Sequence, residues 1–263
     1  MKTPMSNLNH HPDADTSVQM LSARQQQNGY AAHQKWVRTL LEVESDDTVL
    51  EVGCGYGAHL PHLSAVSSRV VAVEPSNVLR ARAQRGAPNV RVLAEPWESC
   101  TPGGPFSVIL FDKVLTHLSD PVTALQKAFT VAAPDARILL VNLDGMSTTV
   151  NPGLDHDNRR AAEQILAWRA AHGTASGWSS TSAPSVLAKS GWQYTTTHVW
   201  ALSFTTLEEA EHYTPLSSYG AQAYAENAVT QNHADRWLQM TTGNPNTFNC
   251  TLTVRADLAV RTT

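Results

Sequence analysis

Short apolar runs alternate with stretches of helical spacing through the first half of the chain. The apolar runs predict five strands, at Thr48–Val52, Val70–Glu74, Val90–Ala94, Phe106–Phe111 and Arg137–Leu143. The intervening spacing predicts helices at about Ala58–Val66, Asn77–Arg85 and Pro121–Val131. Continuously apolar strands that alternate with helices are buried on both faces. The pattern therefore predicts an α/β fold with a parallel sheet between two layers of helices.

The pattern changes on either side of this region. Residues 1–45 begin with a polar segment that we expect to be flexible, and helical spacing follows from about Ser17 to Val43. After Asp144 the simple alternation stops, and helical patterns occur near residues 145–182 and 205–249. We expect these two insertions to form a helical cap beside the sheet.

The first predicted strand ends in a loop with glycines at alternate positions, Gly53, Gly55 and Gly57. Such a loop lets the backbone approach a ligand closely, with its amide groups facing the ligand. Glu74 lies about twenty residues further on, at the end of the second predicted strand. A carboxylate in that place can accept hydrogen bonds from a ribose diol. The sequence thus predicts a nucleoside-containing cofactor at the carboxyl ends of the strands.

Two cofactor classes use this arrangement. Gly53, Gly55 and Ala58 satisfy the G-x-G-x-x-G/A pattern of dinucleotide sites. Gly57 and Glu51 favour the other class, because an acid beside a pyrophosphate would repel it, whereas an acid beside a cationic amino-acid group is useful. The segment resembles the Glu-x-Gly-x-Gly-x-Gly signature of the class I S-adenosylmethionine-dependent methyltransferases.

The resemblance covers roughly Asp46–Ser203 and a final strand at Cys250–Val260. It implies a doubly wound, mostly parallel sheet of seven strands, in which the last strand runs antiparallel to a sixth at Gln193–Ser203. Residues 46–263 would form the methyltransferase domain, and the N-terminal helices together with the two insertions would build the acceptor pocket.

The resemblance also implies roles for single residues. The loop would bind the methionyl part of the cofactor, Glu51 its amino group and Glu74 its ribose. Glu95 would meet the adenine amino group, while Trp97 would either pack on adenine or belong to the core. The residues assigned to the cofactor are Glu51, Gly53, Cys54, Gly55, Gly57, Glu74, Pro75, Glu95, Pro96, Trp97 and Asp112.

Catalysis has two candidate interpretations. The segment after the fourth strand resembles the family's helical turn, in which His117 would be a general base or a residue that packs the loop. A metal-dependent variant would use Asp112, Asn142 and Asp144, whose oxygen atoms suit a hard divalent ion. That match is loose, and we expect no resident metal.

The charge and residue composition narrow the range of binding partners that we expect for this chain. The net charge of −4 gives no general attraction to nucleic acid or to an anionic membrane. We expect no secretory signal and no membrane-spanning segment, because the N-terminus is polar and no apolar run is long enough. The three cysteines form no metal or disulfide pattern, which fits a reducing cytoplasm.

These observations predict methyl transfer from S-adenosylmethionine to an O, N or C atom of a small molecule, in specialised metabolism. Two alternatives stay open at this point. A protein of the same fold can bind the cofactor and catalyse a reaction other than methylation. A nicotinamide-dependent oxidoreductase would need a hydride-acceptor site, which the sequence does not reveal.

Overall fold

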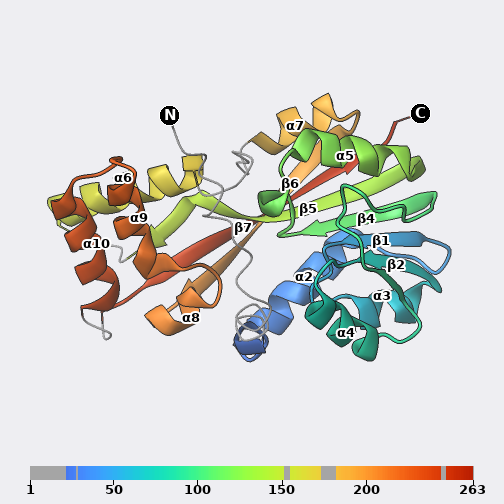
Figure 1. Ribbon diagram of the computed structural model, residues 1–263, viewed down its shortest axis with the longest axis horizontal. Coiled ribbons are helices and arrows are strands. Elements are labelled where there is room, and N and C mark those ends of the chain that lie inside the picture. Colours follow the sequence, from blue (N-terminus) through green and yellow to red (C-terminus); the bar gives the residue numbers. More distant parts are fainter. Residues whose placement is uncertain (1–21, 28, 151–154, 173–181, 244–246, 263) are drawn as a thin grey trace.

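The computed structural model describes residues 22–27, 29–150, 155–172, 182–243 and 247–262 of the chain. The segment expected to be flexible, at the start of residues 1–45, lies outside these ranges. Seven strands form one sheet in the order β3-β2-β1-β4-β5-β7-β6 (Figure 1). The strands are β1 (Thr48–Val52), β2 (Arg69–Val73), β3 (Arg91–Leu93), β4 (Phe106–Asp112), β5 (Ala132–Val150), β6 (Gln193–Phe204) and β7 (Cys250–Val260).

The strand pairing confirms the predicted doubly wound, mostly parallel sheet. Strands β1 to β5 pair in parallel, and β7 runs antiparallel between β5 and β6. The strand order reverses between β1 and β4. Ligands of open α/β sheets bind at such a reversal, beyond the carboxyl ends of the strands.

Helices cover both faces of the sheet because alternate side chains of each strand point to opposite sides. Val49 and Leu110 face the helices of one side, the α3 face, whereas Leu50 and Ile109 face those of the other side, the α5 face. The α3 face is covered by α2 (Tyr30–Leu41), α3 (Leu60–Val66) and α4 (Asn77–Gly86). The α5 face is covered by α5 (Pro121–Thr130) and α7 (Ala183–Lys189).

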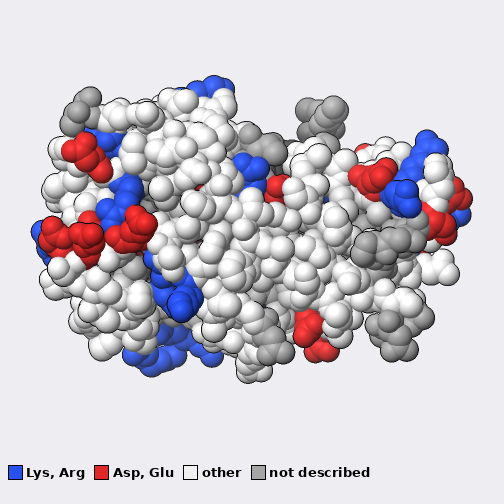
Figure 2. Space-filling view, turned by 180° about the vertical axis from the view of Figure 1, so that it is seen from behind, with Lys and Arg blue, Asp and Glu red and all other residues white. Residues whose placement is uncertain are grey.

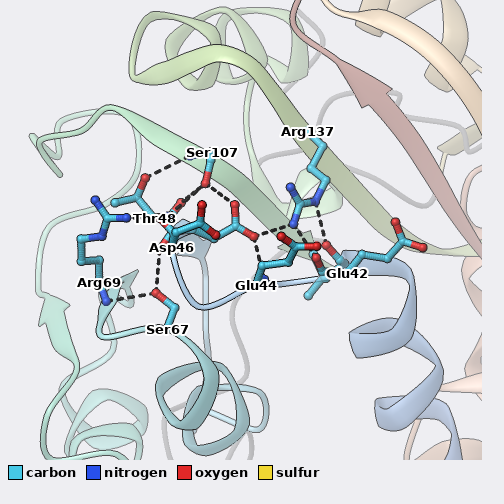
Figure 3. Close-up of polar contacts among 10 residues, drawn as sticks. Glu42, Glu44, Asp46, Thr48, Ser67, Arg69, Ser107 and Arg137 are labelled. Carbon is cyan, nitrogen blue, oxygen red and sulfur yellow. Dashed lines mark hydrogen bonds and ion pairs between the residues drawn. The ribbon is translucent and has the colours of Figure 1, made fainter.

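A polar network fixes the C-terminal end of α2 at the amino ends of the strands. The Asp47 carboxylate accepts hydrogen bonds from Ser107 Oγ at 2.6 Å and from the Glu44 amide at 2.8 Å. Arg137 reaches the same carboxylate at 2.6 Å and also donates to the Leu41 carbonyl at 2.8 Å (Figure 3). The network therefore joins α2 to β1, β4 and β5.

Strand β5 is longer than the apolar run that predicted it. It continues past Leu143 as far as Val150, because Thr149 and Val150 pair with Thr251 and Cys250 of β7. The outer parts of β5, β6 and β7 carry the cap at one end of the molecule (Figure 1, left). Its helices are α6 (His156–His172), α8 (Leu207–Glu211), η3 (Leu216–Ser218), α9 (Tyr219–Ala225) and α10 (Gln231–Thr242).

The cap helices pack on one another, and their buried side chains belong to the same apolar cluster as the α3 face of the sheet. Helix α10 packs against α6 and α9, and the Trp237 indole donates to the Leu216 carbonyl at 2.8 Å. Among the described helices, none is long and apolar enough to cross a membrane.

Candidate functional site

The glycine loop lies where β1 ends. All three glycines have positive φ, which side-chain-bearing residues rarely adopt. Their surroundings differ. A Cβ added to Gly57 would lie 2.9 Å from the Ala83 Cα of α4, whereas no described atom would lie within 4 Å of a Cβ at Gly55. Gly57 thus permits close packing of α4, and Gly55 faces space in which a ligand can lie.

Glu74 follows β2 directly and holds this loop in place. Its Oε2 accepts a hydrogen bond from the Gly55 amide at 2.9 Å, and its Oε1 accepts one from the Ser76 amide at 2.8 Å. Pro75 lies between Glu74 and Ser76 in the sequence, and Ser76 is the N-cap of α4. Each carboxylate oxygen can accept more than one hydrogen bond, so these two bonds do not by themselves prevent Glu74 from accepting ribose hydroxyls as well.

Glu51 points to the α3 face from within β1. Its side chain is 2% exposed, and its Oε2 has no hydrogen-bond partner in the described part of the chain. Burial raises its pKa well above the ordinary value; Asp112 adds to this shift and Lys113 opposes it. A cation placed beside Glu51 would stabilise the ionised carboxylate.

Asp112 ends β4 and is the centre of a charged group. Its Oδ1 pairs with Lys113 Nζ at 2.5 Å, and its Oδ2 lies 3.2 Å from His59 Nε2 at the start of α3. Burial would raise the pKa of Asp112, but Lys113 and His59 outweigh it and hold this pKa below its usual range. Asp112 is therefore an ionised carboxylate beside the buried Glu51.

Helix α2 adds residues that the sequence analysis did not assign to the site. The Tyr30 hydroxyl hydrogen-bonds to the hydroxyl of Tyr56, which lies between Gly55 and Gly57 in the loop. His33, one turn further along α2, is buried beside the ring of Trp200, with ring centroids 6.4 Å apart. Burial, with Lys113 second, lowers the pKa of His33 to about 3, so this imidazole is neutral at physiological pH.

The sequence held only a weak signal for these α2 residues. The helical spacing placed α2 before the first strand, but no motif indicated that its first turn reaches the glycine loop. A tyrosine between two loop glycines was the visible sign, because its side chain has to leave the tight turn and meet a neighbour.

The three residues after β3 that were expected to contact adenine differ in their exposure. Glu95 and Pro96 are exposed. Trp97 is 3% exposed, donates its indole N–H to the Ala124 carbonyl at 3.1 Å and meets Phe111 edge-on. Of its two interpretations, the structure favours the core residue, and little of the ring is left for a cofactor.

His117 lies in the short helix η1 (Leu115–His117) after β4. Its side chain is exposed, whereas the neighbouring Leu115 and Leu118 are buried. The two leucines pack this turn, so the interpretation of His117 as the packing residue is not supported. A base role stays a prediction.

The three residues of the metal hypothesis do not converge. Asp112 pairs in register with Val141 and points to the α3 face. Asn142 is the next residue and points to the α5 face, as Asp144 does. In addition, the described residues contain no group of three or more His, Cys, Asp or Glu side chains that could hold a metal ion.

Comparison with known proteins identifies the family. A family model of a methyltransferase domain matches residues 22–197, more than half of the chain. The chain belongs to this methyltransferase family. Membership supports S-adenosylmethionine as the cofactor and gives no support to the nicotinamide alternative.

Individual relatives of this methyltransferase are distant. An uncharacterised 37.1 kDa protein in transposon TN4556 of Streptomyces fradiae is 27% identical over 118 residues, which are 42% of this chain and 34% of that protein. The match thus spans about a third of the curated relative. No activity can be carried over from it.

Solved structures show the same fold. One from Bacillus halodurans C-125 has a TM-score of 0.63 and 12% identity, with 88% of this chain and all of that chain covered. Geranyl diphosphate C-methyltransferase of Streptomyces coelicolor A3(2), solved with Mg²⁺, geranyl diphosphate and S-adenosyl-L-homocysteine, has a TM-score of 0.51 and 15% identity, with 97% and 86% covered. At such identities the likeness concerns the fold.

Proposed function

We propose that this methyltransferase transfers the methyl group of S-adenosylmethionine to an O, N or C atom of a small-molecule acceptor in specialised metabolism. One observation carries the proposal. Gly55 faces open space and donates its amide to the Glu74 carboxylate, while the buried, partly unpaired carboxylate of Glu51 lies in the same strand-loop segment, two residues before Gly53. An ammonium group and a ribose diol are the groups that this pair of acids would hold.

The residues fit the cofactor in the following way. Glu51 and the ionised Asp112 would attract the amino group, and the backbone at Gly53–Gly57, with Cys54 inside it, would surround the methionyl chain. Glu74 would bind the ribose, and Glu95 would reach the adenine amino group. Pro96 offers no N–H for a backbone contact to the adenine ring.

The chemistry needs little covalent help from the protein. The sulfonium supplies an activated methyl group with a good leaving group. The chain then has to align the acceptor in line with the methyl group and exclude water. Helix α2 suits the second task, because Tyr30 joins the glycine loop and His33 adds a neutral, buried ring nearby.

Two observations support a small acceptor. The S. coelicolor enzyme has a similar fold and was solved with geranyl diphosphate, a small molecule. On the face drawn in Figure 2, basic and acidic side chains are interspersed, and much of the surface carries neither. A cytoplasmic location and the absence of nucleic-acid or membrane partners stay predictions, as does the domain boundary at residue 46.

Calorimetry and methyl transfer test the proposal separately. The protein should bind S-adenosyl-L-homocysteine at micromolar-scale affinity and should bind neither NAD nor NADP. Radiolabelled S-adenosylmethionine should then release its methyl group to a member of an acceptor panel. Tight nicotinamide binding without sulfonium binding would refute the proposal, and cofactor binding without transfer to any acceptor would favour the non-methylating alternative.

A further inference from the structure

A second polar group lies on the α5 face of the sheet, where β5, β7 and β6 run side by side. It consists of Asn142, Arg255, Asp257 and Thr197, which we call the Asn142 cluster. Arg255 is the register partner of Asn142, and Thr197 is the register partner of Asp257. The cluster is separate from Glu51 and Asp112, which point to the α3 face.

Part of the cluster is bonded internally. Thr197 Oγ1 donates to Asp257 Oδ1 at 2.5 Å, and Arg255 Nη2 lies 3.2 Å from Thr197 Oγ1 and 3.4 Å from Asp257 Oδ1. These contacts hold the guanidinium near the centre of the group. Burial raises the pKa of Asp257, and the Thr197 and Arg255 contacts oppose that shift.

Four polar atoms of the cluster lack a partner among the described residues. They are both amide atoms of Asn142, Asp257 Oδ2 and Arg255 Nε. Asn142 is 1% exposed and Asp257 is fully buried. Buried polar groups are nearly always hydrogen-bonded in folded proteins, so a cluster of unpaired atoms requires a partner that the fold does not supply.

The cluster lies near the end of β4 and also approaches the surface. Asn142 directly follows Val141, the register partner of Asp112, so it lies one strand away from the carboxyl end of β4. On the outer side, Val199 is the register partner of Arg255 and is 59% exposed. The cluster thus lies one strand away from the end of β4 and next to an exposed apolar side chain of β6.

We propose that the Asn142 cluster binds a carboxylate of the methyl acceptor, while the apolar body of the acceptor packs near Val199. A guanidinium and an amide N–H are suitable donors to a planar anion. The inference rests on the proposed function, because it places the acceptor beside the cofactor. The rival occupant is ordered water.

Asn142→Leu tests whether the fold itself uses this side chain. If Asn142 serves a ligand, removing a buried, unpaired amide should raise the Tm of the free protein by about 2–4 °C. The control is Asn158→Leu, since Asn158 bonds to Asp155 and Arg236 and its loss should give no such rise. A fall in Tm for Asn142→Leu would overturn the inference.

Benzoate and the uncharged benzamide test the ligand class by thermal shift in the presence of S-adenosyl-L-homocysteine. Benzoate should give a saturable shift, whereas benzamide should not. Arg255→Gln should weaken benzoate binding at least tenfold while the affinity for S-adenosyl-L-homocysteine stays unchanged. No saturable benzoate shift, or equal shifts for both probes, would overturn the inference and favour water. Failure of the wild-type protein to bind S-adenosyl-L-homocysteine would instead refute the proposed function.

Discussion

Glu74→Ala separates the two tasks that the structure gives to this carboxylate. In the free protein it accepts the amides of Gly55 and Ser76, at 2.9 and 2.8 Å. In the complex it is expected to accept the ribose hydroxyls as well. The substitution should therefore weaken cofactor binding and also loosen the glycine loop.

The magnitudes follow from the bonds that are lost. A hydrogen bond to a charged group contributes about 1.5–3 kcal/mol. The Gly55 amide lies beside open space and can bond to water instead, so we expect the free energy of unfolding to fall by about 1–3 kcal/mol rather than by the sum of two bonds. Loss of the ribose contact should raise the Kd of S-adenosyl-L-homocysteine by about 13- to 160-fold.

The assay pairs urea unfolding with calorimetry on two ligands, 5′-methylthioadenosine and its 2′-deoxy analogue. Glu74→Ala should weaken the first ligand more than the second, because only the first has the 2′-hydroxyl. Glu98→Ala, an exposed acid after β3, is the control. Equal losses for both ligands would show that Glu74 acts through the loop only, and unchanged affinities would place the ribose elsewhere.

Three further outcomes are expected. Gly55→Val should abolish binding of S-adenosyl-L-homocysteine in calorimetry, because the side chain would enter the open space and the positive φ would strain the loop. The circular dichroism spectrum should be kept because the strain is confined to the loop; retained binding would contradict the site. His117→Ala should leave Tm unchanged since the side chain is exposed, and a turnover about 10²–10⁴-fold lower would identify it as the base. Asp47→Asn should lower the free energy of unfolding by about 1–3 kcal/mol at pH 7. Although burial opposes the shift, Ser107, the Glu44 amide and Arg137 lower the Asp47 pKa. The contribution is therefore fully present above the unfolded pKa of about 4 and is lost as the pH falls through the folded pKa. A difference in urea unfolding that does not shrink as the pH is lowered would refute this.

The sheet could be predicted from the sequence because its signals are local. Each parallel strand contains a short apolar run, and β1 and β7 have the bounds that the pattern predicted. The outer part of β5 could not be predicted. Its residues beyond Leu143 are mostly polar or small, and they form a strand because β7 offers them a partner.

The site residues of the glycine-loop motif could be predicted from the sequence, whereas the site residues of α2 could not. Glu51, Gly55 and Glu74 follow a motif of fixed spacing, so their proximity could be inferred before the fold was known. Tyr30 and His33 have no such motif. They reach the glycine loop because α2 lies across the α3 face, and that placement is a tertiary property.

Helix α2 connects the two ends of the sheet through one rigid element. Its twelve residues span about 18 Å. The Asp47–Arg137 network fixes its C-terminal end, and the bond between Tyr30 and Tyr56 fixes its first turn over the glycine loop. A helix held at both ends can shield the methyl group from water without a large closing motion. We therefore expect the acceptor to enter from the α5 face, which α2 does not cover and on which the Asn142 cluster lies.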